Sequence, residues 1–371
     1  MKYITSKPSM PSHEDFCKIS EIIWQSGHFT NFGPIHGKYL HGLKNYFKCR
    51  NLALANNATT ALAGAITLLA LRGKKNIITS PFTFSATADA IVAAKKNPVF
   101  VDVGYNDFNI NPGAVMDVID ENTSAIMPVH CYGYPCDVEG FNKISKETGI
   151  PIIYDAAHAF GVSQNRKHLL LNGDASVIST HATKAFNSIE GAVVYFSDNK
   201  NIQKFEEFTN FGISDGQVNL PGLNGKLSEL HAAVGLLNLD RFEEVYQQRK
   251  IICESYDRAF SSNNNLALYQ PGQRVKLNFG YYPLVIRSPE LNAKQLVKEL
   301  AEKDVYVRAY FDPTLDEMPA FAKYTRGVPL KNLESLKNNV ICLPTHEDYV
   351  GGVDQIISII SELVELKSPL D

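Results

Sequence analysis

Between residues 50 and 200 the chain alternates short, almost continuously apolar runs with longer segments whose apolar residues recur at helical spacing. Continuous apolar runs of this length are typical of parallel strands that are covered on both faces. Their alternation with helices predicts a doubly wound, mostly parallel α/β sheet. The expected strands are 76–80, 99–103, 125–130, 152–155 and 191–197, and the expected helices are 61–71, 85–95 and 138–148.

The pattern changes after Leu227. Residues 228–260 carry apolar positions near helical spacing and predict one long helix, followed by an Asn-, Gly- and Pro-containing loop. The remaining expected elements are strands at 281–286, 305–310 and 340–343 and helices at 292–303 and 354–366. A chain of 371 residues is too long for one small core. We therefore expect a large α/β domain with an N-terminal arm over residues 1–240 and a smaller α+β domain over residues 241–371.

Composition excludes several classes of protein. The chain is 44% hydrophobic and 20% charged, with a formal net charge of −3 and no Lys/Arg run, which argues against a nucleic-acid partner. Its six cysteines form no disulfide framework, so we expect a reduced, cytoplasmic protein. The N-terminus lacks the apolar core of a signal peptide. The longest apolar stretch, 61–71, is far shorter than the roughly 18 residues of a membrane span, so no membrane partner is expected.

Lys184 and Asp155 carry the most informative chemistry. Lys184 has small or apolar neighbours, and an amine there can bond covalently to an aldehyde once it loses its proton. Asp155 follows an apolar strand, and the carboxyl ends of such strands are where α/β sheets place ligands. Together they indicate pyridoxal 5'-phosphate (PLP), whose pyridine nitrogen would pair with the acid. Taken alone, Lys184 could be a surface lysine, and Asp155 could merely cap the next turn.

Further residues fit the same cofactor. His158 is a candidate hydrogen-bond partner of the ring hydroxyl, although an ordinary buried histidine is the alternative. The turn at residues 57–60 offers the Thr59 hydroxyl and a helix start for the phosphate, and Ser179 adds a second hydroxyl. Phe84 could stack on the ring; a plain helix cap and core packing are the alternatives for Thr59 and Phe84.

No metal site is expected. His130, Cys131, Cys136, His158 and His181 match no standard ligand spacing. The segment Gly73-Lys74-Lys75 also lacks the upstream glycine and the following Ser/Thr of a P-loop.

Seven segments, taken together, resemble the DegT-type sugar aminotransferases, which are fold type I PLP enzymes that aminate nucleotide-linked ketosugars. The segments are Thr30–Pro34, Asn57–Leu62, Pro81–Ala88, Pro98–Asp102, Pro128–Gly133, Asp155–His158 and Gly222–Leu230. The chain departs from the family pattern at Ala58, Tyr154 and Ala192, and none of these changes removes a group that the chemistry requires.

The resemblance implies catalytic roles for Lys184 and Asp155 and a homodimer with shared active sites, in which Asn224 reaches the partner's phosphate. The residues that it implies for cofactor binding are Ala58, Thr59, Phe84, Asp155, His158, Ser179, Lys184 and Asn224. Those that it implies for substrate binding are Thr30, His181, Lys226, Arg308 and Tyr310.

The segment around the lysine, with His181 before it and Glu190-Gly191 after it, is similar to that of members acting at C4 of the sugar. This implies transfer from L-glutamate, through pyridoxamine 5'-phosphate, to the C4 ketone of dTDP-4-keto-6-deoxy-D-glucose. Action at C3, the C4-epimeric product, another nucleotide and another amino donor stay open. A PLP-dependent sugar dehydratase carries histidine in place of the lysine, so Lys184 argues against it. A PLP-binding regulatory protein without turnover is the alternative from another class.

Overall fold

The structure is a computed structural model that describes residues 1–288, 291–325 and 327–365. Its centre is a sheet in two parts, one ordered β2-β10-β9-β6 and one ordered β4-β3-β5. Parallel bridges from Ile126 to Ile152 and from Val129 to Asp155 join the two parts. The strands are β2 (Leu52–Ala55), β10 (Ala192–Phe196), β9 (Ala175–Ser179), β6 (Ile153–Asp155), β5 (Thr123–Met127), β3 (Asn76–Thr79) and β4 (Asn97–Phe100).

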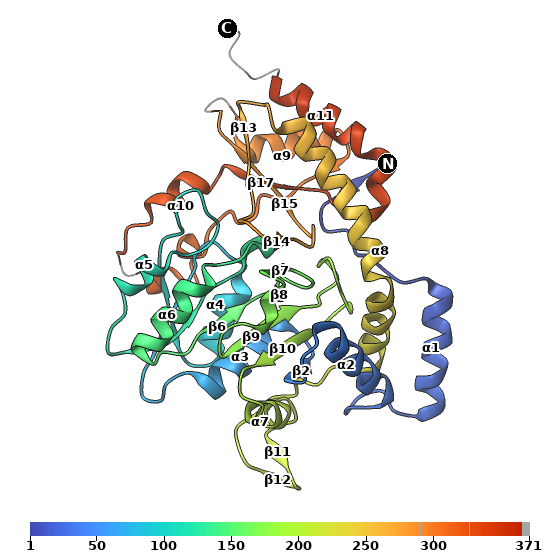
Figure 1. Cartoon of the computed structure of the whole chain (residues 1–371), viewed down its shortest axis with the longest axis vertical. Coiled ribbons are helices and arrows are strands. Elements are labelled where there is room, and N and C mark those ends of the chain that lie inside the picture. Colours follow the sequence, from blue (N-terminus) through green and yellow to red (C-terminus); the bar gives the residue numbers. More distant parts are fainter. Residues whose placement is uncertain (289–290, 326, 366–371) are drawn as a thin grey trace.

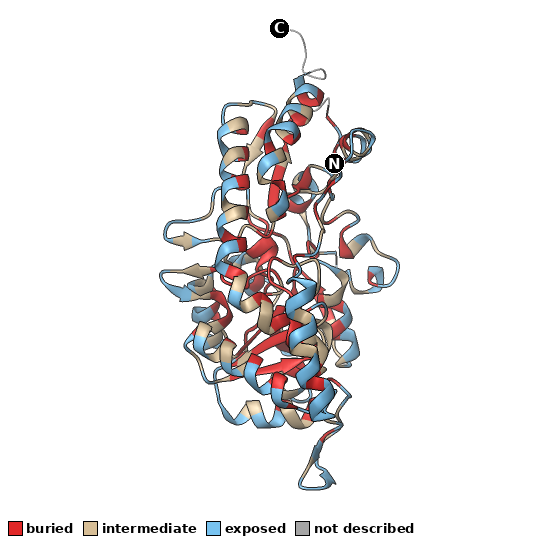
Figure 2. Cartoon of the chain, turned by 90° about the vertical axis from the view of Figure 1, so that its right-hand side faces the viewer, coloured by how far each residue is buried: buried red, intermediate tan, exposed pale blue. Residues whose placement is uncertain are grey.

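Within this sheet β10 alone runs antiparallel to its neighbours, β2 and β9. The pairs β6–β9, β3–β4 and β3–β5 are parallel. The strands are almost wholly buried between helices, as Figure 2 shows. The expected α/β class with a mostly parallel sheet is confirmed.

Helices cover both faces of the sheet and extend beyond it (Figure 1). They are α1 (His13–Ser26), α2 (Pro34–Phe47), α3 (Ala58–Leu69), α4 (Ser85–Ala93), α5 (Pro112–Met116), α6 (Val138–Thr148), α7 (Lys200–Thr209) and α8 (Glu229–Phe260). The α8 helix begins at the Ser228 cap and connects the sheet region to the C-terminal region. A small hairpin, β11 (Ile213–Ser214) and β12 (Gln217–Val218), projects from the opposite end of the molecule.

The C-terminal region has its own antiparallel sheet and its own apolar core. Its elements are β13 (Leu266–Leu268), β15 (Tyr282–Ile286), β17 (Val340–Leu343), α9 (Ala293–Glu302), α10 (Lys331–Leu336) and α11 (Val353–Glu365). The N-terminal strand β1 (Tyr3–Ile4) pairs with β16 (Val305–Tyr306), so the first residues pack on this region. Smaller strands are β7 (Ser163–Gln164), β8 (Lys167–His168) and β14 (Val275–Lys276). A domain division near residue 240 would fall inside α8 and stays a prediction.

Several boundaries differ from those predicted. The strand expected at 99–103 is β4, which already begins at Asn97 and includes Pro98. The strand expected at 305–310 is ordered only at Val305–Tyr306, after which Arg308 bridges to Cys342. The C-terminal helix begins at Val353, and its predicted end at Leu366 lies outside the described residues. The elements that were not predicted include β2, β9 and the helices α1, α2 and α7.

Three findings concern the described residues as a whole. No helix among them is long and apolar enough to cross a membrane. No group of three or more His, Cys, Asp or Glu side chains within the described ranges is placed to hold a metal ion. The cysteines at 17, 49, 131, 136, 253 and 342 are free thiols.

Candidate active site

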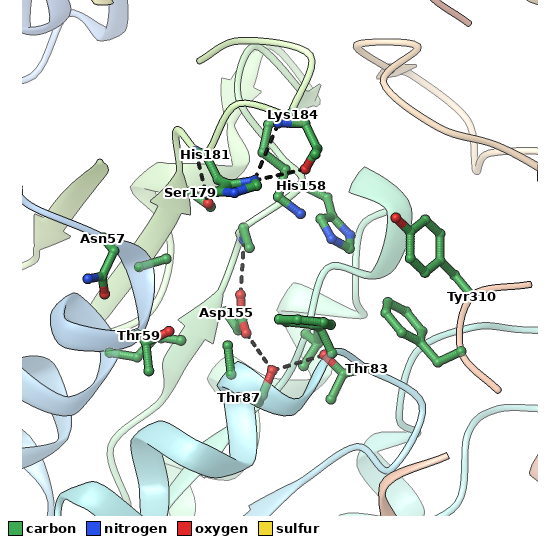
Figure 3. Close-up of a pocket in the computed structure, with 18 of the residues that line it drawn as sticks. Asn57, Thr59, Thr83, Thr87, Asp155, His158, Ser179, His181, Lys184 and Tyr310 are labelled. Atoms are coloured by element: carbon green, nitrogen blue, oxygen red, sulfur yellow. Dashed lines mark hydrogen bonds between the residues drawn. The ribbon is translucent and has the colours of Figure 1, made fainter. Parts of the chain in front are cut away.

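A cavity of about 310 Å³ opens at the edge of the sheet where the parallel strands end. β6 ends at Asp155 and the neighbouring β9 ends at Ser179, while the antiparallel β10 starts nearby, after Glu190. Figure 3 shows Asp155, His158, Ser179 and Lys184 around this common space. The lining residues are Asn57, Ala58, Thr59, Leu62, Thr83, Phe84, Ala86, Thr87, Val129, Asp155, Ala157, His158, Ser179, His181, Thr183, Lys184, Glu190, Tyr281, Tyr310 and Phe311.

Asp155 is a buried carboxylate held by two donors. Its Oδ2 accepts a 2.7 Å hydrogen bond from the Thr87 hydroxyl of α4, and its Oδ1 accepts the backbone N–H of Ala157 at 3.0 Å. Burial raises the pKa of Asp155, while both hydrogen bonds and the Lys184 charge act in the opposite direction. A cationic ring nitrogen beside Asp155 would stabilise its charged form further.

Lys184 is half-buried in the loop between β9 and β10, and its Nζ donates a 2.9 Å hydrogen bond to the Tyr281 hydroxyl. Burial lowers the pKa of Lys184 to about 8, against opposing effects of Tyr310, Asp155 and Cys131. An ordinary lysine with a pKa of about 10.4 would be almost fully protonated at neutral pH. The Lys184 amine is therefore far more available as a nucleophile and as a base.

His158 has a defined hydrogen-bonding role. Its Nδ1 accepts the backbone N–H of Tyr132 at 2.9 Å, and burial, followed by the Lys184 charge, lowers the pKa of the ring. A neutral imidazole whose Nδ1 accepts must carry its proton on Nε2. His158 can therefore donate from Nε2 to an acceptor in the cavity.

The part of the cavity at the start of α3 is suited to an anion. The side chain of Asn57 caps α3 by accepting the Thr60 N–H at 2.8 Å. The first amides of a helix, here those of Ala58 and Thr59, have no acceptor within their own helix, and the helix dipole favours negative charge. The Thr59 and Ser179 side chains line the same cavity. Phe84 is 61% exposed and therefore presents a ring to the cavity rather than to the core.

A histidine–carboxylate pair stands beside these groups. His181 Nε2 lies 3.5 Å from Glu190 Oε1, and both side chains are half-exposed. His181 Nδ1 also contacts the Thr183 hydroxyl at 3.0 Å. The pair and Tyr310 supply hydrogen-bonding groups for a polar substrate.

Four of the residues predicted from sequence do not line this cavity: Asn224, Thr30, Lys226 and Arg308. Asn224 and Thr30 are exposed. Lys226 is largely buried with its Nζ 4.4 Å from the centre of the Phe211 ring, and Arg308 is exposed beyond β16. A single chain does not test the cofactor and substrate contacts expected of these four residues, and those contacts stay predictions.

Among the site residues that were not predicted, Thr87 and Tyr281 contact the two central side chains. Thr87 lies in Pro81–Ala88, one of the segments that resemble the family. The sequence therefore offered its hydroxyl as a candidate partner for Asp155. Tyr281 is 97 positions from Lys184, and no motif or spacing in the sequence connects them.

Comparison with known proteins identifies the family of the chain. The profile of the DegT/DnrJ/EryC1/StrS aminotransferase family matches residues 12–361. The chain belongs to this family. Its members are PLP-dependent sugar aminotransferases, so the enzyme class and the cofactor expected from the sequence are confirmed.

Two relatives carry the same name, dTDP-4-amino-4,6-dideoxy-D-glucose transaminase. The one from Shigella dysenteriae is 35% identical over 362 residues, which is 96% of this chain and 98% of the relative. The one from Escherichia coli is 33% identical and covers 92% of this chain and 93% of its own length.

Solved structures agree with the fold. Helicobacter pylori PseC, an aminotransferase involved in pseudoaminic acid biosynthesis, matches with a TM-score of 0.92 at 25% identity, covering 99% of this chain and all of PseC. DesI, crystallised in the presence of its TDP-sugar product, matches with a TM-score of 0.89 at 27% identity, covering 98% of this chain and 94% of DesI. These likenesses confirm the fold type I architecture.

The cavity of this chain fits the family's cofactor. Its donor set combines an acid for the ring nitrogen, a neutral histidine for the ring hydroxyl, an amine for the aldehyde and a helix start for the phosphate. We therefore propose Asp155, His158, Lys184 and the Ala58–Thr59 turn, with Ser179 and Phe84, as the groups that would hold PLP.

Proposed function

We propose that the enzyme moves the amino group of L-glutamate to the C4 ketone of dTDP-4-keto-6-deoxy-D-glucose. The product would be dTDP-4-amino-4,6-dideoxy-D-glucose, for O-antigen or other surface-glycan biosynthesis in the cytoplasm. The observation that carries this proposal is the 35% identity, over nearly all of both chains, to the Shigella dysenteriae relative of that name.

The residues of the site can supply the proton transfers that transamination needs. The Lys184 amine, largely unprotonated above about pH 8, can take the proton from the donor's α-carbon and later deliver a proton to the sugar's C4 carbon. PLP, when bound, supplies the electron sink that makes that α-proton removable. Asp155 would keep the ring nitrogen of bound PLP protonated, and His158 would be available to donate to the ring hydroxyl through Nε2.

The His181–Glu190 pair supports the sugar specificity. It lies at the cavity within the loop that carries Lys184, where a sugar ring entering the cavity would meet both side chains. Hydrogen bonds to individual hydroxyls allow strong discrimination, because an analogue that lacks the group leaves a polar partner unsatisfied. We assign this pair to sugar recognition, together with Tyr310.

We further propose a homodimer with shared sites. Asn224 is exposed and lies next to the projecting β11–β12 hairpin, since Asn210 and Asn224, on either side of the hairpin in sequence, form a bridge. Phe211, Val218 and Leu223, on and next to this hairpin, are 49%, 69% and 49% exposed. Large apolar side chains in such numbers on a projection are typical of a surface that another chain covers. The partner's Asn224 would then complete the phosphate site, and Thr30, Lys226 and Arg308 are proposed to bind the substrate in the dimer.

The test is a panel of nucleotide ketosugars that differ in the nucleotide and in ketone position, each incubated with L-glutamate or an alternative donor. The proposal predicts consumption of dTDP-4-keto-6-deoxy-D-glucose and 2-oxoglutarate formation, with NMR of the product placing the nitrogen equatorially at C4. Amination at C3, an axial C4 amine, or preference for another nucleotide or donor would each overturn the corresponding part. Binding of PLP without turnover of any ketosugar would favour the regulatory alternative.

A further inference from the structure

The segment Asn278-Phe279-Gly280-Tyr281 connects β14 to β15 and brings Tyr281 to the lining of the cofactor cavity. The Asn278 side chain is buried and donates to two backbone carbonyls of the sheet region, that of His158 at 2.8 Å and that of Phe160 at 2.9 Å. Its Oδ1 accepts the Gly280 N–H at 3.0 Å. One side chain thus fixes this segment against the loop that carries His158.

Gly280 allows the segment to approach the lysine loop closely. A Cβ built on Gly280 would lie 2.9 Å from the Cβ of Ala185, the residue after Lys184. From the other side, the Gly280 carbonyl accepts a 3.4 Å hydrogen bond from the Thr345 hydroxyl, to which the buried Arg249 also donates. Any larger residue at 280 would push the segment away from Lys184.

This arrangement places Tyr281 beside Lys184. Its hydroxyl is 2.9 Å from Lys184 Nζ, and its ring centre is 5.5 Å from the same atom. The ring also lies 4.4 Å from the His158 ring, centre to centre. Burial raises the pKa of Tyr281, so the phenol stays neutral and accepts the hydrogen bond without becoming a counter-ion.

We propose that Tyr281 is a positioning residue of the active site: its hydroxyl holds the ε-amine of Lys184 whenever that amine is not bonded to the cofactor. The inference rests on the proposed role of Lys184. A transaminase must release its lysine from the cofactor in the first half of the cycle and recapture it at the end of the second. A long, flexible side chain loses much conformational freedom when it is held, so a fixed acceptor keeps the amine ready for return.

The test measures the Lys184 amine itself. The full chain is loaded with pyridoxamine 5'-phosphate, which leaves the lysine free, and labelled with acetic anhydride from about pH 6 to pH 11. Mass spectrometry of the Lys184 peptide gives the titration midpoint. Tyr281→Phe removes the acceptor that favours the charged amine, so the midpoint should fall by about one pH unit. The other titratable groups that face Lys184 stay in place: Asp155, His158, Cys131 and Tyr310.

Tyr282→Phe is the matched control. Tyr282 is the next residue, and its hydroxyl donates to Asp257 at 2.9 Å instead of reaching Lys184. Its removal should leave the midpoint unchanged. Gly280→Ala keeps the phenol but displaces it, so the midpoint should fall as in Tyr281→Phe; this variant decides the matter if Tyr281→Phe does not fold.

An unchanged midpoint in folded Tyr281→Phe, or an equal shift in Tyr282→Phe, would overturn the inference. If Tyr281→Phe is unfolded, an unchanged midpoint in Gly280→Ala would do so. Failure of the proposed role of Lys184 is detected separately, because borohydride would then attach PLP to another lysine. Attachment to Lys184 together with an unchanged midpoint would refute only the role of Tyr281.

Discussion

Burial acts in opposite senses on the charges of the two central residues. It lowers the pKa of Lys184 to about 8, which favours the neutral amine that the chemistry needs. It raises the pKa of Asp155, which opposes the carboxylate that the chemistry needs. The Thr87 hydroxyl and the Ala157 N–H compensate for the second effect, because hydrogen bonds to a carboxylate favour its charged form.

Asp155→Asn tests this residue. Asparagine keeps the shape and can still accept one hydrogen bond, but it cannot hold the ring nitrogen protonated. We expect a folded protein that retains cofactor and turns over about 100-fold more slowly or worse, at tenfold per ~1.4 kcal/mol of barrier. Steady-state kinetics, circular dichroism and the cofactor-to-protein ratio measure this, with the exposed Asp89→Asn on α4 as the control. Near-normal turnover would mean that Asp155 is only a turn cap.

At the scale of elements, the start of α2 depends on a residue of α8. The N-cap of α2, Gly33, has no side chain to cap the helix. Instead both carboxylate oxygens of the buried Glu229 accept α2 amides, from Ile35 at 2.7 Å and from His36 at 2.8 Å. A Cβ on Gly33 would lie 2.7 Å from Glu229 Cδ, so glycine is required for this approach. The same contact fixes the turn that follows Thr30.

Glu229→Gln should destabilise the protein. The amide group has one acceptor oxygen where the carboxylate has two, so one buried N–H of α2 loses its partner. We expect a loss of about 1–3 kcal/mol in the free energy of unfolding, with a lower thermal midpoint. Glu244→Gln, an exposed position on the same helix, should change neither. A thermal midpoint equal to that of the wild type would show that the Glu229 contact does not stabilise α2.

Elements with a clear local signal were predictable, and the exceptions have physical reasons. Residues 138–148 and 340–343 were predicted with the observed bounds because each is a regular apolar pattern between turn residues. β4 starts before Pro98, which a strand tolerates here because β4 is at the edge of the sheet. In β9, the buried Ser176 and Ser179 interrupt the apolar pattern, although the strand is central.

In the candidate site, too, the residues in local motifs were predictable, and a residue brought in by contacts distant in sequence was not. Asp155, His158 and Lys184 lie in local motifs, and the sequence predicted that they would meet at one sheet edge. Tyr281 reaches the site only through contacts such as that of Asn278 with His158, 120 positions apart. A hydrogen bond over such a separation has no signature in a single sequence.

At the scale of the whole molecule, the proposed dimer gives two equivalent sites that each need both chains. An Asn224→Ala chain mixed with a Lys184→Ala chain should recover activity, because one site of each heterodimer would combine the intact Lys184 and the intact Asn224. Each homodimeric variant should be weak or inactive by itself. Activity is measured after subunit exchange has been confirmed with two differently tagged chains.

The control mixes two Lys184→Ala chains that carry the same two tags, which should stay inactive. If the first mixture shows no activity beyond the sum of its parents, the shared-site proposal fails. Asn224 would then act within its own subunit or not at all.

The most direct test of the central proposal is to find the lysine that binds the cofactor. The protein is loaded with PLP, reduced with borohydride, digested and analysed by mass spectrometry. We expect the reduced cofactor on the peptide containing Lys184, and in Lys184→Ala neither the adduct nor transaminase activity. The cofactor on another lysine, or wild-type turnover by Lys184→Ala, would contradict the proposed site.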